Sequence, residues 1–245
     1  MRVFLSLILM TTMVVPLEAG PEEMGPLDLD ENTLLLARYA ESIDADYAVV
    51  DPRAEGQARL VEGLFGKAIH ASKGWMTPET TVAEIEMFPL FVPITYARDN
   101  VNPRSGCLEM YVNFAEVVEP EYFRRVMTWE SGIYYASGYV ILALRPAEEE
   151  QWLQLIVKSP VDGAEVTLSA PFPYEWAGTW RHIGFQWDAE RYGLIIDGEV
   201  VAEEPAVADG MPAPDTRIAI GAHARGVNVA EALIDELRIS DTPRY

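Results

Sequence analysis

One strand and the hairpin after it, within residues 180–202, restrict the fold of this chain more than any other feature. From Ile183 to Trp187 every second residue is large and apolar, and the residues between them are polar or small. This period of two predicts a strand with one buried face. Asp197-Gly198 then separates two short β-rich runs, which is typical of a type I′ turn because both central residues need a positive φ. The stretch therefore predicts an antiparallel sheet.

The rest of the chain repeats the pattern in short pieces. Alternation recurs in residues 108–114, 153–157, 166–168, 218–220 and 233–239, with turn residues between the runs. Such spacing is typical of a β-sandwich or barrel. A short helix is expected only near residues 119–125. The fold class predicted is all-β, a two-sheet antiparallel β-sandwich, as one domain over residues 33–245 after a linker at residues 20–32.

The first residues have the layout of a secretory signal peptide. Arg2 is followed by an apolar run at residues 3–15, and the small residue Ala19 offers a cleavage site. The alternative is a membrane anchor, but about 13 apolar residues fall short of the roughly 20 that span a bilayer. We predict a signal peptide at residues 1–19, a secreted or extracytoplasmic location, and no membrane insertion of the mature form.

The net charge limits the classes of molecule that the protein can bind, and the cysteine content limits its disulfide chemistry. The formal net charge is −21, which disfavours nucleic acid, anionic lipid and anionic polysaccharide because each would be repelled. A neutral polysaccharide, a cation or a basic protein surface remains compatible. Cys107 is the single cysteine, so no intrachain disulfide can form. Its thiol is either buried and inert, as free cysteine often is, or exposed and reactive.

Five motifs in order resemble the laminin G-like branch of the concanavalin A-like lectin and glucanase superfamily, a jelly-roll fold. Together they run over roughly residues 33–242, nearly all of the mature chain. The resemblance implies two packed, curved antiparallel sheets but no single function, since members include lectins, glycosidases and adhesion modules. The motifs are Gly63-Leu64-Phe65-Gly66-Lys67-Ala68, Leu108-Glu109-Met110-Tyr111-Val112, Trp180-Arg181-His182-Ile183-Gly184-Phe185, Tyr192-Gly193-Leu194-Ile195-Ile196-Asp197-Gly198-Glu199 and Ala232-Leu233-Ile234-Asp235-Glu236-Leu237-Arg238-Ile239.

Catalytic chemistry finds little support in the sequence. Glycosidases need two carboxylates that face one cleft, and the nearest pair is Glu84 and Glu86, where the third acid of the Glu-x-Asp-x-x-Glu pattern usual in the family's retaining enzymes is missing. No serine lies in a Gly-x-Ser-x-Gly elbow, and the three histidines are scattered. His182 is expected to be a structural imidazole. We therefore name no catalytic residue.

Asp235 is the candidate for a metal ligand. Period two places it on the face of Leu233, Leu237 and Ile239, where a carboxylate is costly unless it is paired. Hydrogen bonds from backbone N–H groups or an arginine would satisfy it. Calcium would also do so, with Asp44, and Asp46 beside it, as further ligands, because calcium takes several carboxylate oxygens and relatives in this superfamily bind it. The sequence leaves both solutions open, and a structural calcium ion is the one cofactor that it suggests.

Aromatic side chains offer a surface for sugars. Trp75, Trp152 and Trp176 lie beside turns and are expected to be exposed, and Trp180 and Trp187 are expected in the core. Ordinary packing is the alternative, since large aromatics dominate sandwich cores. A further aromatic group follows in Tyr134, Tyr135 and Tyr139.

The leading hypothesis from the sequence is an exported, non-catalytic binding module, lectin-like and specific for a neutral glycan. A protein-interaction or cell-surface structural module is the first alternative, with the acidic surface engaging basic partners or cations. A degenerate glycosidase is the second, and it depends on whether Glu84 and Glu86 line a cleft. The sequence identifies no individual ligand-binding residue.

Overall fold

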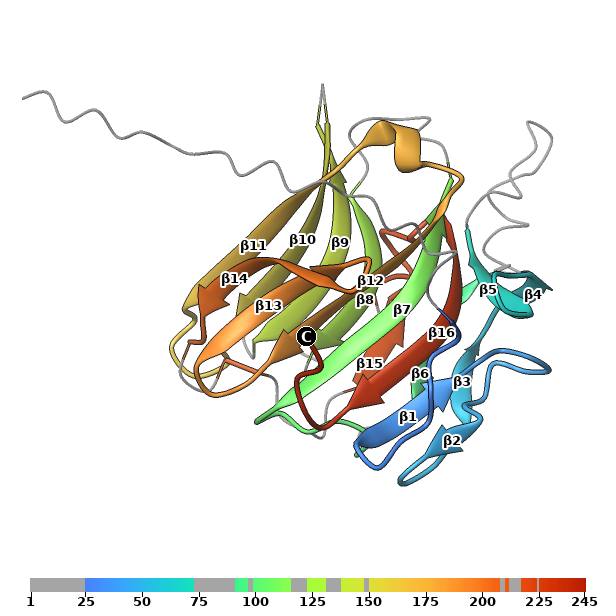
Figure 1. The fold of residues 1–245 in the computed structure, drawn as a ribbon, viewed down its shortest axis with the longest axis horizontal. Coiled ribbons are helices and arrows are strands. Elements are labelled where there is room, and N and C mark those ends of the chain that lie inside the picture. Colours follow the sequence, from blue (N-terminus) through green and yellow to red (C-terminus); the bar gives the residue numbers. More distant parts are fainter. Residues whose placement is uncertain are drawn as a thin grey trace, which may run out of the picture.

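The structure is a computed structural model, and it describes residues 25–72, 91–96, 99–115, 123–130, 138–147, 150–207, 210–211, 217–223 and 225–245. Its elements are almost entirely strands (Figure 1). They are β1 (Thr33–Ala37), β2 (Tyr47–Ala48), β3 (Ala54–Gln57), β4 (Arg59–Glu62), β5 (Lys67–Ala71), β6 (Val92–Tyr96), β7 (Gly106–Phe114), β8 (Arg124–Glu130), β9 (Tyr139–Pro146), β10 (Gln151–Lys158), β11 (Glu165–Phe172), the 3₁₀ turn η2 (Tyr174–Trp176), β12 (Trp180–Trp187), β13 (Arg191–Ile196), β14 (Glu199–Pro205), β15 (Arg217–Ile220) and β16 (Ala232–Ser240).

Two antiparallel sheets pack face to face. The nine-stranded sheet has the order β14-β13-β12-β7-β16-β1-β2, with β5 also pairing with β16 and β4 with β5. The seven-stranded sheet has the order β11-β10-β9-β8-β15-β6-β3. In Figure 1 the nine-stranded sheet lies in front of the other. The predicted two-sheet antiparallel sandwich is confirmed.

Alternation along the strands builds the core. In β7, Leu108, Met110, Val112 and Phe114 face the other sheet, and in β12 the inner positions include Phe185 and Trp187. These side chains belong to one cluster of buried residues that fills the space between the sheets. Fully burying each large apolar side chain stabilises the fold by about 1.5–3 kcal/mol. The polar residues between them are left on the outer face of the nine-stranded sheet.

The predicted hairpin forms with the expected turn. Asp197 has φ +49° and Gly198 has φ +79°, as a type I′ turn requires. The Asp197 carboxylate also joins the turn to β12, because Oδ1 accepts the backbone N–H of His182 at 3.1 Å and Oδ2 pairs with Nη1 of Arg181 at 2.8 Å. The turn residue therefore sets both the hairpin and the start of the neighbouring strand.

A β-bulge in β16 changes which face its residues occupy. The pairing with β7 shifts register between Asp235 and Arg238, and Glu236 has φ +53°. Because of this extra residue, Leu237 belongs to the core while Asp235 lies beside Tyr111 on the outer face. The prediction that Asp235 shares the face of Leu237 was wrong, since strict alternation fails at a bulge.

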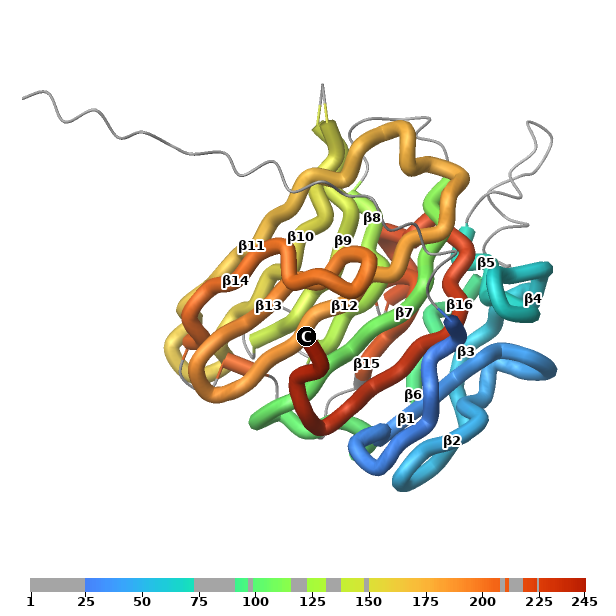
Figure 2. Tube along the Cα trace, viewed as in Figure 1, coloured from blue at the N-terminus to red at the C-terminus, as the bar shows by residue number. Residues whose placement is uncertain are grey.

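The ends of the chain lie against the nine-stranded sheet. Residues 25–32, within the predicted linker, contact the sheet, and Leu27 is buried there. Figure 2 shows the chain after β16 turning back so that its carboxyl-terminal end lies over β12 and β7. The predicted signal peptide lies outside the described residues. Of the helix expected near residues 119–125, the last two residues instead begin β8 and residues 119–122 are not described.

The described part of the chain contains no helix that is long and apolar enough to cross a membrane.

Candidate functional site

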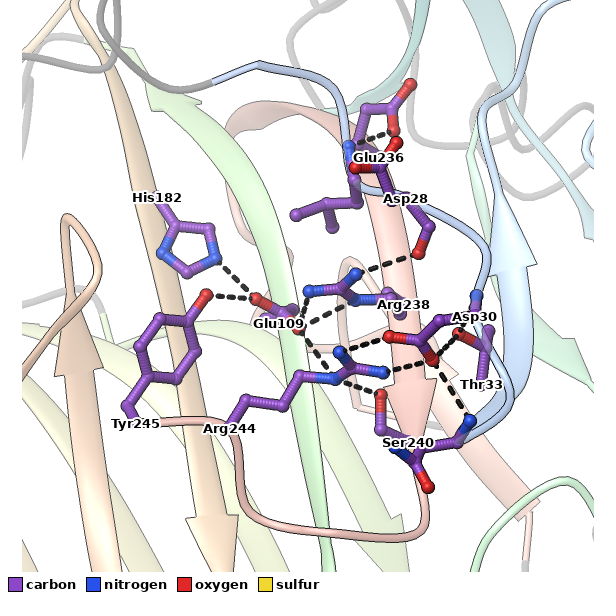
Figure 3. A network of polar contacts seen from close by, with 12 residues as sticks. Asp28, Asp30, Thr33, Glu109, His182, Glu236, Arg238, Ser240, Arg244 and Tyr245 are labelled. Atoms are coloured by element: carbon purple, nitrogen blue, oxygen red, sulfur yellow. Dashed lines mark hydrogen bonds and ion pairs between the residues drawn. The ribbon is translucent and has the colours of Figure 1, made fainter.

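A buried carboxylate organises the outer face of the nine-stranded sheet (Figure 3). Glu109 of β7 is 0% exposed. Its Oε2 accepts hydrogen bonds from Nε2 of His182 at 2.9 Å and from Oη of Tyr245 at 2.6 Å, and its Oε1 accepts Nε of Arg238 at 2.8 Å. Gly184 faces Glu109 across the strand pair, where a Cβ would come within 2.5 Å of the carbonyl oxygen of Leu108. Glycine therefore leaves room for the glutamate.

Electrostatics keep Glu109 ionised. Burial alone would raise its pKa, but the hydrogen bond and charge of His182, the charge of Arg238 and the hydrogen bond from Tyr245 hold the pKa at about 2. An ion in this position stabilises the fold only because its oxygens are satisfied.

Two arginines connect Glu109 to the amino-terminal segment. Arg238 also donates to the carbonyl oxygen of Asp28 at 2.8 Å. Arg244 approaches Glu109 at 3.7 Å and binds both carboxylate oxygens of Asp30 at 2.7 and 2.8 Å. The first described residues and the last ones thus meet over the same carboxylate.

One amide side chain holds the carboxyl-terminal tail. Oε1 of Gln186 accepts the backbone N–H groups of Arg244 at 3.1 Å and Tyr245 at 3.0 Å, and its Nε2 donates to the main-chain oxygen of Tyr245 at 2.7 Å. The Glu109 network is therefore a clasp for both ends of the domain. Both carboxylate oxygens of Glu109 are used within the protein.

His182 and Cys107 are both part of this covered region. His182 is 1% exposed and bonded to Glu109, as expected for a structural imidazole. Cys107 is 0% exposed, and burial raises the pKa of its thiol. A buried thiol that stays protonated is a poor nucleophile. The inert alternative for Cys107 is the one that its surroundings support.

The predicted calcium ligands do not meet. Oδ2 of Asp235 accepts the backbone N–H groups of Leu64 at 2.8 Å and Phe65 at 3.0 Å, in the turn between β4 and β5. Asp44 instead accepts the N–H of Ala54, at 2.8 Å. Among the described residues no group of three or more His, Cys, Asp or Glu side chains is placed to hold a metal ion. Calcium binding at Asp235 therefore stays a prediction.

The tryptophans that were candidates for sugar binding or for the core lie in different parts of the sandwich. Trp187 is 1% exposed in the core, whereas Trp180 is half-buried on the outer face of the nine-stranded sheet, so its expected core position was wrong. Trp176 is half-buried against Phe172, and Arg181 stacks over its ring at 4.0 Å. Trp152 is half-buried on β10.

Several residues singled out from the sequence lie outside the described part of the chain. They are Trp75, Glu84, Glu86, Tyr134 and Tyr135.

The outer face of the seven-stranded sheet is the second polar surface. Along β10, burial alternates, so Leu153, Leu155 and Val157 face the core and the half-buried side chains of residues 152, 154, 156 and 158 face outward. Gln154 lies opposite Ser169 of β11 and donates to its Oγ at 3.1 Å through Nε2. Its Oε1 is buried and has no hydrogen-bond partner within the described chain.

An apolar strip lies beside these polar groups. Tyr139, Ile141 and Ala143 of β9 form a small cluster on the outer face, and Phe123 and Ile156 pack against it. Sequence reasoning missed this strip because the alternating residues of β9 are apolar on both faces. An indole, an apolar strip and amide and hydroxyl groups on one face can together bind a small polyhydroxylated molecule.

Three solved structures show the same fold at low identity. Domain 4 of AbnA, a GH43 extracellular arabinanase from Geobacillus stearothermophilus, in complex with arabinotriose, is 14% identical with a TM-score of 0.59, over 86% of this chain and 93% of that one. The binding domain of Paraclostridial mosquitocidal protein 1 is 11% identical with a TM-score of 0.61, over 87% of this chain and 50% of that one. The botulinum neurotoxin serotype D ligand-binding domain in complex with N-acetylneuraminic acid is 8% identical with a TM-score of 0.59, over 87% and 48%.

The present chain spans about half the length of the toxin binding domains that it matches. A search of curated protein sequences finds no match. One family model, described as the concanavalin A-like lectin/glucanases superfamily, matches residues 94–244, which is more than half of the 245 residues. With that match and the two-sheet sandwich together, the chain belongs to the concanavalin A-like lectin/glucanases superfamily.

Proposed function

We propose that this protein is an exported, non-catalytic carbohydrate-binding module that recognises a neutral glycan on the outer face of its seven-stranded sheet. The single observation that carries the proposal is the half-buried indole of Trp152 on the same strand face as Gln154. The apolar C–H groups of a sugar ring stack on an aromatic face, and an amide beside that face can form a hydrogen bond with a sugar hydroxyl.

Charge favours a neutral sugar over an acidic one. The net charge of −21 repels an anionic glycan, whereas the groups around Trp152 that carry no charge, Gln154 and Ser169, bind hydroxyls without needing a counter-charge.

The superfamily and the similar structures support the same conclusion. The family description includes lectins, and two of the similar structures have bound sugars, arabinotriose in the arabinanase domain and N-acetylneuraminic acid in the toxin domain. The arabinanase is described as extracellular, which agrees with the predicted signal peptide.

A glycan array followed by isothermal titration calorimetry tests the proposal. The wild-type protein should bind at least one neutral oligosaccharide, and Trp152→Ala should weaken binding at least about tenfold, because a buried aromatic anchor contributes about 2 kcal/mol or more. Tyr47→Ala removes an aromatic group that is 38% exposed at the edge of the other sheet and should leave affinity unchanged. If the protein bound none of the glycans, the proposal would be contradicted. If Trp152→Ala bound the oligosaccharide as tightly as the wild type, the binding site would lie elsewhere.

A protein-interaction role is the alternative, and one surface favours it. Val49 and Val50 are 55% and 53% exposed beside the edge strand β2. Their backbone is held in place, because the N–H of Val50 donates to Oδ1 of the buried Asn100 at 3.0 Å. If this surface binds a protein partner, Val49→Ser with Val50→Ser should abolish co-purification and leave glycan binding intact.

A further inference from the structure

An exposed arginine lies directly beside the indole that carries the proposed glycan site. Arg145 of β9 pairs with Trp152 of β10, in a register that runs unbroken along both strands. Leu144 and Leu153, their neighbours in sequence, both belong to the core, so Arg145 and Trp152 share the outer face. Side chains directly opposite each other in an antiparallel pair have Cβ atoms about 4.5–5.5 Å apart. The guanidinium can therefore reach a sugar that stacks on the indole.

The Arg145 guanidinium is available to a ligand. The residue is exposed, and within the described part of the chain its side chain takes part in no hydrogen bond or ion pair. Acids outnumber lysines and arginines by 39 to 18 in this protein, and other arginines are paired with them, as Arg181 is with Asp197. All the N–H donors of Arg145 thus remain open to a molecule bound at Trp152.

The other outer-face positions around this pair carry no charge. On β9, β10 and β11 they are Ala143, Gln154, Ser169 and Pro171. Gln154 uses one of its two N–H donors on Oγ of Ser169. Hydrogen bonds from an ionised donor are roughly twice as strong as those between neutral groups. Arg145 therefore supplies the strong donor next to the indole.

A guanidinium binds a particular arrangement of acceptors. Its N–H groups form a planar, rigid fork, to which two neighbouring oxygens can bind together. In a neutral sugar the matching group is a pair of hydroxyls on adjacent carbons, at the edge of the ring that stacks on the indole. A carboxylate also matches the fork. It is disfavoured because the segment between β9 and β10 contains Glu148, Glu149 and Glu150 and the net charge is −21.

We propose that Arg145 is a specificity-determining residue of the glycan site, which selects neutral sugars that have two free hydroxyls on adjacent carbons beside the ring stacked on Trp152. This role rests on the proposed function, which supplies the stacked sugar. The choice of hydroxyl pattern depends on Arg145.

Isothermal titration calorimetry with neutral trisaccharides tests this role. The probes are arabinotriose, xylotriose, maltotriose and mannotriose, each also prepared with one hydroxyl of every adjacent pair blocked by a methyl group. The wild type should bind at least one free trisaccharide and should bind its methylated form about tenfold more weakly, because a charge-assisted hydrogen bond is lost.

Substitutions at Arg145 separate its contact from a general effect of methylation. Arg145→Met removes the donors, so it should bind free and methylated trisaccharides equally, at the weaker level of the methylated form. Arg145→Lys keeps the charge without the fork and should recover only part of the difference. Arg53→Met is the matched control. It removes an exposed guanidinium beside β3, at the opposite edge of the same sheet, and should bind like the wild type.

The outcomes separate this role from the proposed function. If Trp152→Ala abolishes binding but Arg145→Met binds free trisaccharides like the wild type, the role of Arg145 is wrong and the glycan site stands. The role is also wrong if methylation weakens binding equally in the wild type and in Arg145→Met. Tighter binding of trigalacturonic acid than of every neutral trisaccharide would contradict both proposals. If no trisaccharide binds, the role is wrong, and the glycan array decides the proposed function separately.

Discussion

Oη of Tyr245 donates a 2.6 Å hydrogen bond to Oε2 of Glu109, which lies 136 residues earlier in the chain. The last residue of the sequence thus completes the hydrogen bonding of a fully buried carboxylate on the outer face of the nine-stranded sheet. Arg244, the residue before it, connects the same tail to Asp30. The carboxyl-terminal tail and the amino-terminal segment are therefore connected through Arg244. Loosening one of these segments should loosen the other as well.

Tyr245→Phe should lower the free energy of unfolding by about 1–2 kcal/mol, because a hydrogen bond to an ionised, buried acceptor is lost. Urea unfolding should show a lower midpoint with an unchanged slope. Tyr47→Phe, at an exposed tyrosine, is the matched control and should change little. Equal stability of the two variants would show that the tail hydrogen bond contributes nothing.

Glu109 should make the protein sensitive to acid. Its pKa is about 2 in the folded state against an ordinary value of 4.5. A lowered pKa contributes stability that is present above the ordinary value and lost as pH falls towards the folded one. The shift corresponds to about 3 kcal/mol. Stability of the wild type should fall between about pH 5 and pH 2.

Glu109→Gln should remove that dependence and should destabilise the protein at pH 7, since Arg238 would be left buried with a neutral partner. Chemical denaturation at a series of pH values measures both effects. A variant with the same acid dependence as the wild type would assign the titration to other carboxyls.

Glu236 should have the opposite effect on pH dependence. Burial raises its pKa from 4.5 to about 7, although it accepts the backbone N–H of Leu27 at 2.9 Å. A raised pKa in an acid means that folding favours the protonated form, so stability is highest in acid and falls as pH rises from about 4.5 to 7.

Glu236→Gln should therefore gain stability over the wild type above pH 7, by up to about 3 kcal/mol. Melting temperatures of the two proteins, compared at pH 5 and pH 8, give the difference. The proteins should converge at pH 5, and a difference independent of pH would show that Glu236 does not titrate in this range.

Gly184→Ala should destabilise the fold by about 1–3 kcal/mol, because the added methyl group would collide with backbone atoms of β7 beside Glu109. Gly25→Ala, where a Cβ would have no atom within 4 Å, is the control. Unfolding midpoints of both variants against the wild type measure the cost. An unaffected Gly184→Ala would mean that β7 and β12 can separate without penalty.

Cys107 should react with a thiol reagent only as fast as the protein opens, because its thiol is buried and its pKa is raised. The reaction should be slow in buffer and complete within minutes in denaturant. Tyr245→Phe should speed it, since the tail covers this part of the sheet. Rapid reaction of the native wild type would contradict the burial of the thiol.

Much of the fold could be predicted from local pattern. The alternation in β7, β10 and β12 predicts one buried face, and Asp197-Gly198 predicts its turn, because both depend on neighbours within a few residues. The face of Asp235 could not be predicted in this way. A bulge adds one residue to the strand, so the residues after it switch faces, and the local sequence pattern gives no sign of the bulge.

The clasp was missed for a related reason. Glu109 alternates with apolar residues and resembles any solvent-facing acid. It is buried because β12 and β16 lie on either side of it. β16 supplies Arg238, directly opposite Glu109, and β12 supplies His182, two residues before Gly184, the residue opposite Glu109. That arrangement depends on which strands become neighbours. A better signal would have been the number of basic residues at the outer positions of nearby strands.

The sequence by itself determined the antiparallel sandwich, its hairpin turn and the net negative charge, because periodicity and turn chemistry are properties of short segments and charge is a property of composition. Only the tertiary structure decided which polar side chains are buried and where the two termini meet. Those features come from strand order, which is set by the packing of segments that lie far apart in the chain.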